Sequence, residues 1–369
     1  MNIEEFDDLA QEFDEDDGEL FPEVYYQWDD ALSANLTPPY IEEDDLLMII
    51  NLYLDDGDVE KARKTIDYTF RFYPSDMELL ADVLMSLNEC ELWNDIIDLV
   101  EQYDSMPDIW VDCHKISALL HLGLEEEAYT WFILRKELYR IEEDDYALLY
   151  QAMCEALTDV DLFESAIAIL NEARQIFGNS EELEWLNLQI DISKEDKESA
   201  MKTAARIEKM NPLDGLTWHN LGRIYANDLD APENAIDAFE FAESLNFREQ
   251  PNYLYLICMY EKCEYYLKAL DKIKEYESRF DENLMLQVLA ISICTELGMW
   301  NESLNYVNRA INRAPEISSL YICKSDILQT LGETQKARSV LEEGIRQTAD
   351  NGGELKKKLK NLLKLYPDK

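Results

Sequence analysis

Apolar residues recur at helical spacing in residues 216–247. The pattern predicts two short amphipathic helices, because residues three or four positions apart share one face of a helix. The apolar positions of the first helix are Trp218, Leu221 and Tyr225, and those of the second are Ala235, Phe239 and Ala242. We therefore expect a helical hairpin over this stretch.

The same pattern repeats from Ile41 onward. One residue in each second helix, small in every copy except the second, would allow that helix to approach the first closely. These markers are Ala62, Ile96, Ala128, Ala166, Ala200, Ala235, Ala269, Ser303 and Ala337. They lie about 34 residues apart, and the residue four positions after each marker is apolar in every copy. The chain is therefore predicted to contain nine hairpins in phase.

The hairpin at 216–247 closely resembles the tetratricopeptide repeat, a helix-turn-helix unit of about 34 residues. The matching residues are Trp218, Leu221, Gly222, Tyr225, Ala235, Phe239 and Ala242, with one extra residue in the turn. The family's tryptophan stands in place only at Trp218. The resemblance implies an all-α, right-handed superhelical solenoid of about nine hairpins over residues 41–350, in which each hairpin buries its apolar face on its neighbours.

The weakest joint in the repeat series lies between Ala128 and Ala166, which are 38 residues apart. The additional residues are expected to form a longer linker at 140–145. A bend or a local break in the stack is predicted at this joint.

Residues 1–40 are predicted to be a separate acidic arm. Residues 1–60 contain no Lys or Arg, so this segment repels itself when compacted, and we expect it to be partly disordered and mobile up to about Gly18. Val24, Trp28 and Leu32 nevertheless keep helical spacing, so part of the arm could dock on an apolar surface.

Residues 351–369 are predicted to form a basic amphipathic helix. One stripe holds Leu355, Leu359, Leu362, Leu363 and Tyr366, and lysines surround it. We expect this helix to cap the exposed end of the solenoid. A basic amphipathic helix can also lie on an anionic membrane, but its shortness and the acidic body before it favour the cap.

Composition narrows the classes of partner and compartment. With 79 acidic against 33 basic residues, the formal charge of -46 would repel a nucleic-acid backbone. Seven cysteines without framework spacing suggest free thiols in a reducing compartment. Residues 1–10 hold no base, and the longest apolar run, 253–260, is too short to cross a bilayer. The sequence therefore favours a cytoplasmic protein that binds neither nucleic acid nor membrane.

No pattern for catalysis is present in the sequence. Cys113, His114 and His121 lie near one another, but no second ligand pair accompanies them, so they are interpreted as packing or surface residues. A glycine-rich phosphate loop and a nucleophile turn are both absent from the sequence. We therefore predict no enzymatic activity, no catalytic residue, no cofactor and no metal.

The resemblance also implies where a partner would bind. In this family the first helix of each repeat lines a concave groove. Carried across one residue at a time, the groove positions are Leu47, Asn51, Met85, Trp110, Gln151, Trp185, Gln189, His219, Arg223, Leu254, Val288 and Ile322. Such a mixture suits a peptide held by apolar anchors and side-chain amides. The alternative is that some of the tryptophans pack between repeats.

Three classes of function remain. The leading hypothesis is a non-catalytic scaffold or adaptor that binds a peptide or protein in the groove, with a basic partner favoured by the acidic surface. The second is a structural protein that self-assembles through its acidic arm and basic tail. An enzyme or an RNA binder is a distant third, because an RNA-binding groove needs more basic residues than Arg223. The sequence does not distinguish a monomer from a dimer.

Overall fold

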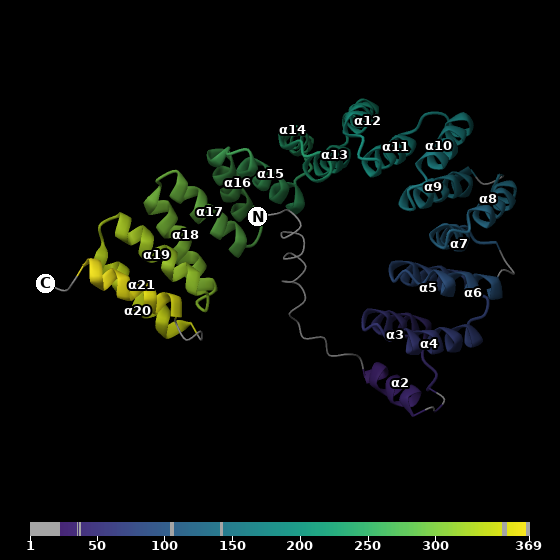
Figure 1. Cartoon of the computed structure of the whole chain (residues 1–369), viewed down its shortest axis with the longest axis horizontal. Coiled ribbons are helices and arrows are strands. Elements are labelled where there is room, and N and C mark those ends of the chain that lie inside the picture. The colour runs from purple at the N-terminus through teal and green to yellow at the C-terminus, as the bar shows by residue number, and fades with distance from the viewer. Residues whose placement is uncertain are drawn as a thin grey trace. The chain divides into compact units, whose positions relative to one another are not determined.

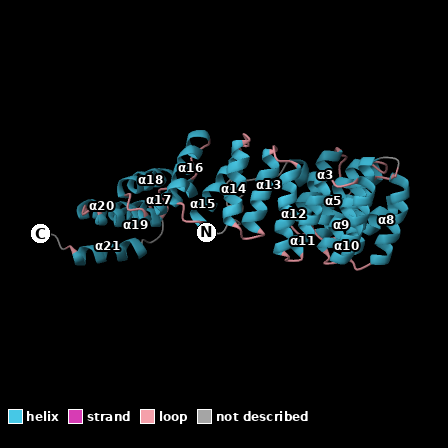
Figure 2. Cartoon of the chain, turned by 90° about the horizontal axis from the view of Figure 1, so that it is seen from above, coloured by secondary structure: helices cyan, strands magenta, loops and turns pink. Residues whose placement is uncertain are grey.

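The computed structural model describes residues 23–34, 36, 38–103, 107–140, 143–348 and 353–366. In these ranges all regular structure is α-helical, and there is no strand (Figures 1 and 2). The helices form two compact units, one ending at Asn211 and the other beginning at Pro212.

Among its described residues, the first unit holds one single helix and five hairpins. The single helix is α2 (Glu23–Ser33). The hairpins are α3 (Glu43–Asp55) with α4 (Val59–Phe72), α5 (Met77–Glu89) with α6 (Trp93–Tyr103), α7 (Ile109–His121) with α8 (Glu125–Tyr139), α9 (Glu143–Asp159) with α10 (Phe163–Phe177), and α11 (Glu181–Ser193) with α12 (Lys197–Met210).

The second unit holds four hairpins and a closing helix. The hairpins are α13 (Gly215–Asn227) with α14 (Pro232–Ser244), α15 (Gln250–Lys262) with α16 (Tyr266–Arg279), α17 (Leu284–Glu296) with α18 (Trp300–Arg313), and α19 (Ser318–Thr330) with α20 (Thr334–Gln347). The closing helix is α21 (Gly353–Leu365). The prediction of an all-α solenoid of nine hairpins is confirmed, whereas its superhelical hand stays a prediction.

The marker residues explain why the hairpins form in phase. All nine are completely buried, including the bulky Ile96, and the residue four positions after each marker is buried as well. Small side chains let paired helices approach closely, and the closest approach is at Gly222. A Cβ added there would lie 2.6 Å from Cε1 of Phe239, so the ring of α14 packs directly on the backbone of α13. This contact explains the Leu-Gly pair of the repeat signature.

A left-handed residue ends the first helix of every hairpin. The nine residues with positive φ at this position are Gly57, Glu91, Gly123, Asp161, Glu195, Asp230, Glu264, Gly298 and Gly332. The next residue's amide donates back to a carbonyl of the helix's last turn, as Tyr265 does to Tyr260 at 2.7 Å. Glycine adopts this conformation without strain, so the five acidic residues hold it at a cost.

Acidic and polar side chains begin many of the helices. The carboxylate of Asp214 accepts a hydrogen bond from the amide of Thr217 at 2.8 Å, and Asp58 and Asp76 cap α4 and α5 in the same way. An oxygen acceptor at this position satisfies an amide that has no partner within the helix. Some of the many acidic residues therefore stabilise the first turns of helices.

The linker predicted at residues 140–145 is wrong for residues 143–145, and the predicted local break is wrong as well. The alternative of a bend at this joint stays a prediction. Residues 143–145 belong to α9, which is 17 residues long, so these residues extend a helix instead of a loop. One apolar core cluster includes Phe132 and Tyr139 of α8 together with Leu149 and Tyr150 of α9. The stack is therefore continuous across this joint.

Helix α2 docks on the first hairpin. Trp28 is completely buried, and its indole Nε1 donates to Thr65 Oγ1 of α4 at 3.1 Å. Val24 and Leu32 pack against the same apolar core. The expectation that these three residues form a docked helix is confirmed. The expectation of a mobile segment up to Gly18 lies outside the described residues.

Helix α21 closes the last hairpin. Leu355 and Leu362 are buried, and Lys358 forms an ion pair with Asp326 of α19 at 2.7 Å. These contacts agree with a capping role for α21, which stays a prediction. Leu365 and Tyr366 stay exposed, so the stripe is only partly covered.

Candidate functional site

All twelve predicted groove residues lie on the first helices of the hairpins. In the first unit they are Leu47 and Asn51 on α3, Met85 on α5, Trp110 on α7, Gln151 on α9, and Trp185 and Gln189 on α11. In the second unit they are His219 and Arg223 on α13, Leu254 on α15, Val288 on α17 and Ile322 on α19. We call the exposed part of this set the first-helix surface.

Three large apolar side chains stand out on the first-helix surface. Trp110 is 55% exposed, Met85 is 50% exposed and Val288 is 46% exposed. Gln189 and Arg223 are exposed as well. Trp110 lies in the first turn of α7, whereas Met85 lies in the second half of α5. The structure therefore offers separate apolar anchors instead of one cluster.

The remaining predicted groove residues are partly covered by their own chain. The indole of Trp185 donates to Glu181 of the same helix at 3.2 Å, and the amide of Gln151 donates to Glu155 at 2.9 Å. Oδ1 of Asn51 is buried without a hydrogen-bond partner among the described atoms. The partly covered positions are Leu47, Asn51, Gln151, Trp185, Leu254 and Ile322.

The prediction that His219 faces the groove is wrong. Its side chain is only 6% exposed, and its Nδ1 lies 3.0 Å from Oδ1 of Asn252 on α15. The amide nitrogen of Asn252 in turn donates to the backbone carbonyl of Phe239 on α14. Burial lowers the pKa of His219, so the neutral ring is favoured. His219 therefore joins three helices of the second unit.

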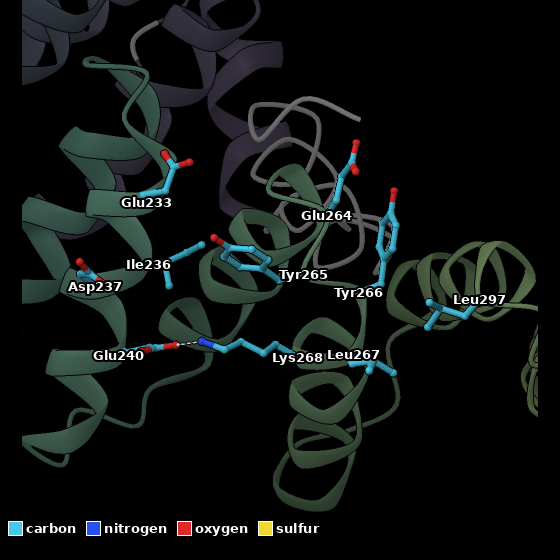
Figure 3. A pocket seen from close by; sticks show the side chains of 10 residues that line it. All are labelled: Glu233, Ile236, Asp237, Glu240, Glu264, Tyr265, Tyr266, Leu267, Lys268 and Leu297. Atoms are coloured by element: carbon cyan, nitrogen blue, oxygen red, sulfur yellow. Dashed lines mark hydrogen bonds and ion pairs between the residues drawn. The ribbon is translucent and has the colours of Figure 1, made fainter.

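A pocket that the sequence pattern did not predict lies between α14 and the start of α16 (Figure 3). Its volume is about 550 Å³. The lining residues are Glu233, Ile236, Asp237, Glu240, Glu264, Tyr265, Tyr266, Leu267, Lys268 and Leu297. We call it the acidic pocket, because four of these ten side chains are carboxylates and one is basic.

One carboxylate of the acidic pocket is already paired. Glu240 accepts from the ammonium of Lys268 at 2.8 Å (Figure 3). It also accepts from the hydroxyl of Tyr260 at 2.6 Å. Burial alone would raise the pKa of Glu240, but these two hydrogen bonds lower it below the usual value. Glu240 therefore stays ionised and holds Lys268 in place.

The acidic pocket has a signal in the sequence that repeat phase could have revealed. Glu264 occupies the left-handed turn position, at which four other hairpins have glycine and four have Asp or Glu. Directly after it come Tyr265 and Leu267, which are 45% and 64% exposed. Strained backbone and exposed apolar side chains in one turn are features that occur at binding sites more often than elsewhere.

A buried charged cluster in the first unit has a structural role. Asp112 of α7 is completely enclosed and accepts from the indole of Trp131 at 3.0 Å and the hydroxyl of Tyr139 at 2.6 Å. Arg135 pairs with the same carboxylate at 2.9 Å, and Lys115 lies 3.7 Å from the Trp131 ring centroid. A buried charge needs such partners, and here they join α7 to α8.

The described ranges contain no group of three or more side chains that could hold a metal ion. His121 stacks on Trp93 with ring centroids 4.1 Å apart and bonds to Ser117, while burial lowers the pKa of His114. The interpretation of these histidines as packing residues agrees with their contacts. Across the same ranges no helix is both long and apolar enough to cross a membrane.

Comparison with known proteins gives only distant likenesses. No family model matches the chain, and no curated protein matches it. Among solved structures, a tetratricopeptide repeat protein from Parabacteroides merdae is 14% identical with a TM-score of 0.37, covering 73% of this chain and 98% of that one. The pentatricopeptide repeat protein PPR10 from maize is 14% identical with a TM-score of 0.49, covering 96% of this chain and 58% of that one.

A third solved structure, the type IV pilus biogenesis factor PilW, is 13% identical with a TM-score of 0.36, covering 59% of this chain and 98% of that one. These likenesses are weak, so the fold assignment rests on the nine hairpins and their buried markers. The protein is a tetratricopeptide-like helical-repeat protein in fold.

Proposed function

We propose that this chain is a non-catalytic interaction scaffold or adaptor, which binds a peptide or protein partner on its first-helix surface. The exposure of Trp110 and Met85 on first helices of the first unit supports the proposal. Aromatic and methionine side chains are enriched at the centres of protein interfaces, where they carry much of the binding energy. A partner that covers these side chains would remove apolar surface from water.

The net charge and the free thiols add a class of partner and a compartment to this proposal. A formal charge of -46 opposes binding to nucleic-acid phosphates and favours a basic partner. All seven cysteines are free, which fits a reducing compartment such as the cytoplasm. The scaffold is proposed to need no cofactor.

The test is quantitative capture from a native lysate by the immobilised chain. The Met85→Ala/Trp110→Ala variant should lose its specific partner, because truncating a central anchor commonly costs about 2 kcal/mol of binding free energy. Leu134→Ala is the matched control, since Leu134 is 62% exposed on the second helix α8 of the same unit. Equal capture by all three proteins, with unchanged melting temperatures, would contradict the proposal.

Self-assembly is the second candidate function. Lys356, Lys360 and Lys364 on α21 alternate with Leu359 and Leu363 around a hollow of about 380 Å³. An acidic segment of a second copy, such as the arm, would complement this basic surface. Light scattering at low and high salt tests the idea, because charge pairing between copies weakens as salt screens it. A particle mass that stays monomeric at low salt would exclude this candidate.

A further inference from the structure

The acidic pocket of the second unit is separate from the first-helix surface. Its walls come from α14, from the turn between α15 and α16, and from the start of α16 (Figure 3). We propose that this pocket binds an arginine or lysine side chain within a basic segment of a protein partner. This inference goes beyond the proposed function, because it concerns second helices and does not depend on Trp110 or Met85.

Charge is the first reason for a basic occupant. The pocket lining has four carboxylates and one lysine, which gives a formal charge of -3. Glu240 is neutralised by Lys268. In the part of the chain that the structure describes, Glu233, Asp237 and Glu264 make no side-chain hydrogen bond or ion pair. Three exposed carboxylates that line one hollow and have no ion-pair partner among the described residues attract a positive group.

The aromatic lining is the second reason. Tyr265 is 45% exposed at the pocket, so its ring is partly accessible to a cation. The pocket's own Lys268 already lies 5.1 Å from the ring centroid of Tyr260 and 5.8 Å from that of Tyr265. Cations within about 6 Å of a ring centroid are attracted to it, arginine most often. A guanidinium would combine ring stacking with a carboxylate hydrogen bond.

The apolar lining favours an occupant whose side chain has an aliphatic stem. Leu267, two residues after Tyr265, is 64% exposed, and Ile236 of α14 points toward the Tyr265 ring (Figure 3). Arginine and lysine stems cover such apolar surface while their charged ends reach polar groups. The volume of about 550 Å³ lies within the range of roughly 300–1,000 Å³ typical of ligand pockets. The pocket therefore accommodates a basic side chain together with parts of its neighbours.

The experiment measures the affinity of a fluorescein-labelled peptide of alternating arginine and leucine for the full chain at physiological salt. The comparison peptide has citrulline in place of arginine, which keeps the side-chain shape but removes the charge. We expect the arginine peptide to bind about tenfold more tightly than the citrulline peptide. Absence of binding, or equal binding of both peptides, would overturn the proposal.

Two matched variants separate the pocket from the general negative charge of the molecule. The pocket variant carries Glu233→Gln, Asp237→Asn and Glu264→Gln. The control variant carries Glu249→Gln, Asp281→Asn and Glu316→Gln, which remove three exposed carboxylates elsewhere in the same unit. The pocket variant should lose about tenfold in affinity and the control variant less than about twofold. Equal losses would assign the binding to diffuse charge and reject the pocket.

A third variant, Tyr265→Leu, keeps every charge and removes the ring. Its affinity for the arginine peptide should fall about threefold. An affinity equal to that of the parent would contradict the proposed placement of the cation. Because these variants leave the first helices unchanged, lysate capture through Trp110 should persist in all of them. Failure of this inference is therefore distinguishable from failure of the proposed scaffold function.

Discussion

The residue with positive φ that follows the first helix of each hairpin is glycine in some hairpins and an acidic residue in others. Glycine occupies it at Gly57, Gly123, Gly298 and Gly332, whereas the other five hairpins have Asp or Glu. A side chain in this conformation costs about 1–2 kcal/mol relative to the right-handed region. The hairpins of this chain therefore carry a local strain that a glycine would relieve.

Replacing Glu195 with glycine should stabilise the protein. Glu195 has a φ of 57° and an exposed side chain, so little packing is lost. Relief of strain outweighs the added freedom of the unfolded chain, and we expect a gain of roughly 0.5–1 kcal/mol in the free energy of unfolding. Urea unfolding of the parent and the variant measures this change in the free energy of unfolding. The reverse change, Gly332→Glu, is the control and should destabilise, so shifts of the same sign in both variants would refute the strain argument.

His219 shows why residue-by-residue transfer from a repeat pattern is limited. The groove position was assigned from phase alone, and phase does place His219 on the correct helix. Whether a side chain at that position is free depends on the neighbouring hairpin, which here supplies Asn252 as a partner. The phase of the repeat does not show which side chains the adjacent hairpin supplies, so it does not show whether a groove position is exposed.

At the scale of elements, α9 is unusual in its length and in the acids of its last turns. Glu155 is half-buried and accepts from Gln151 at 2.9 Å, and Asp159 lies one turn further along the same helix. Burial raises the pKa of Glu155, and the negative charge of Asp159 adds to the effect, although the hydrogen bond from Gln151 opposes it. The folded protein therefore disfavours ionised Glu155.

The Glu155→Gln variant should melt at a higher temperature than the parent at pH 7. Because the folded pKa lies above the unfolded one, the contribution of Glu155 to stability is full below the unfolded pKa and is lost as pH rises through the folded pKa. The advantage of the variant should be roughly 1–2 °C at pH 8 and should shrink toward pH 5. The control variant is Glu316→Gln, which removes an exposed carboxylate. A difference in melting temperature between variant and parent that does not change with pH would contradict the effect of burial on the pKa of Glu155.

Elements were more predictable than their connections. The markers fixed the phase of all nine hairpins, because close helix packing requires a small or well-fitted residue at one position per repeat. The extra residues near 140–145 were misassigned, since spacing counts residues without showing whether they lengthen a helix or a loop. The acidic pocket was missed for a related reason. Its lining joins α14 to the next hairpin's turn, and that contact exists only once the hairpins stack.

For the whole molecule, the dominant property is the net charge of -46. Ion pairs such as Lys262 with Asp230 and Lys274 with Glu302 offset only part of it. Exposed pairs of this kind contribute about 0–1 kcal/mol each, so the repulsion among unpaired acids is the larger electrostatic effect on stability.

Added salt should therefore stabilise the protein. Raising NaCl from about 20 mM to about 200 mM should raise the melting temperature by several degrees, because the Debye length falls from about 20 Å to about 7 Å. Sucrose at the same osmolality is the control for effects unrelated to charge. A melting temperature that falls with salt would show that the ion pairs outweigh the repulsion.

The two single helices have a consequence for how copies of this chain meet. A stack of similar hairpins exposes one apolar face at each end. If these faces are not covered, copies can polymerise end to end without limit. Trp28 of α2 fills the face of the first hairpin, and Leu355 and Leu362 of α21 fill that of the last. Helices α2 and α21 therefore oppose direct stacking of hairpins from a second copy on these two faces.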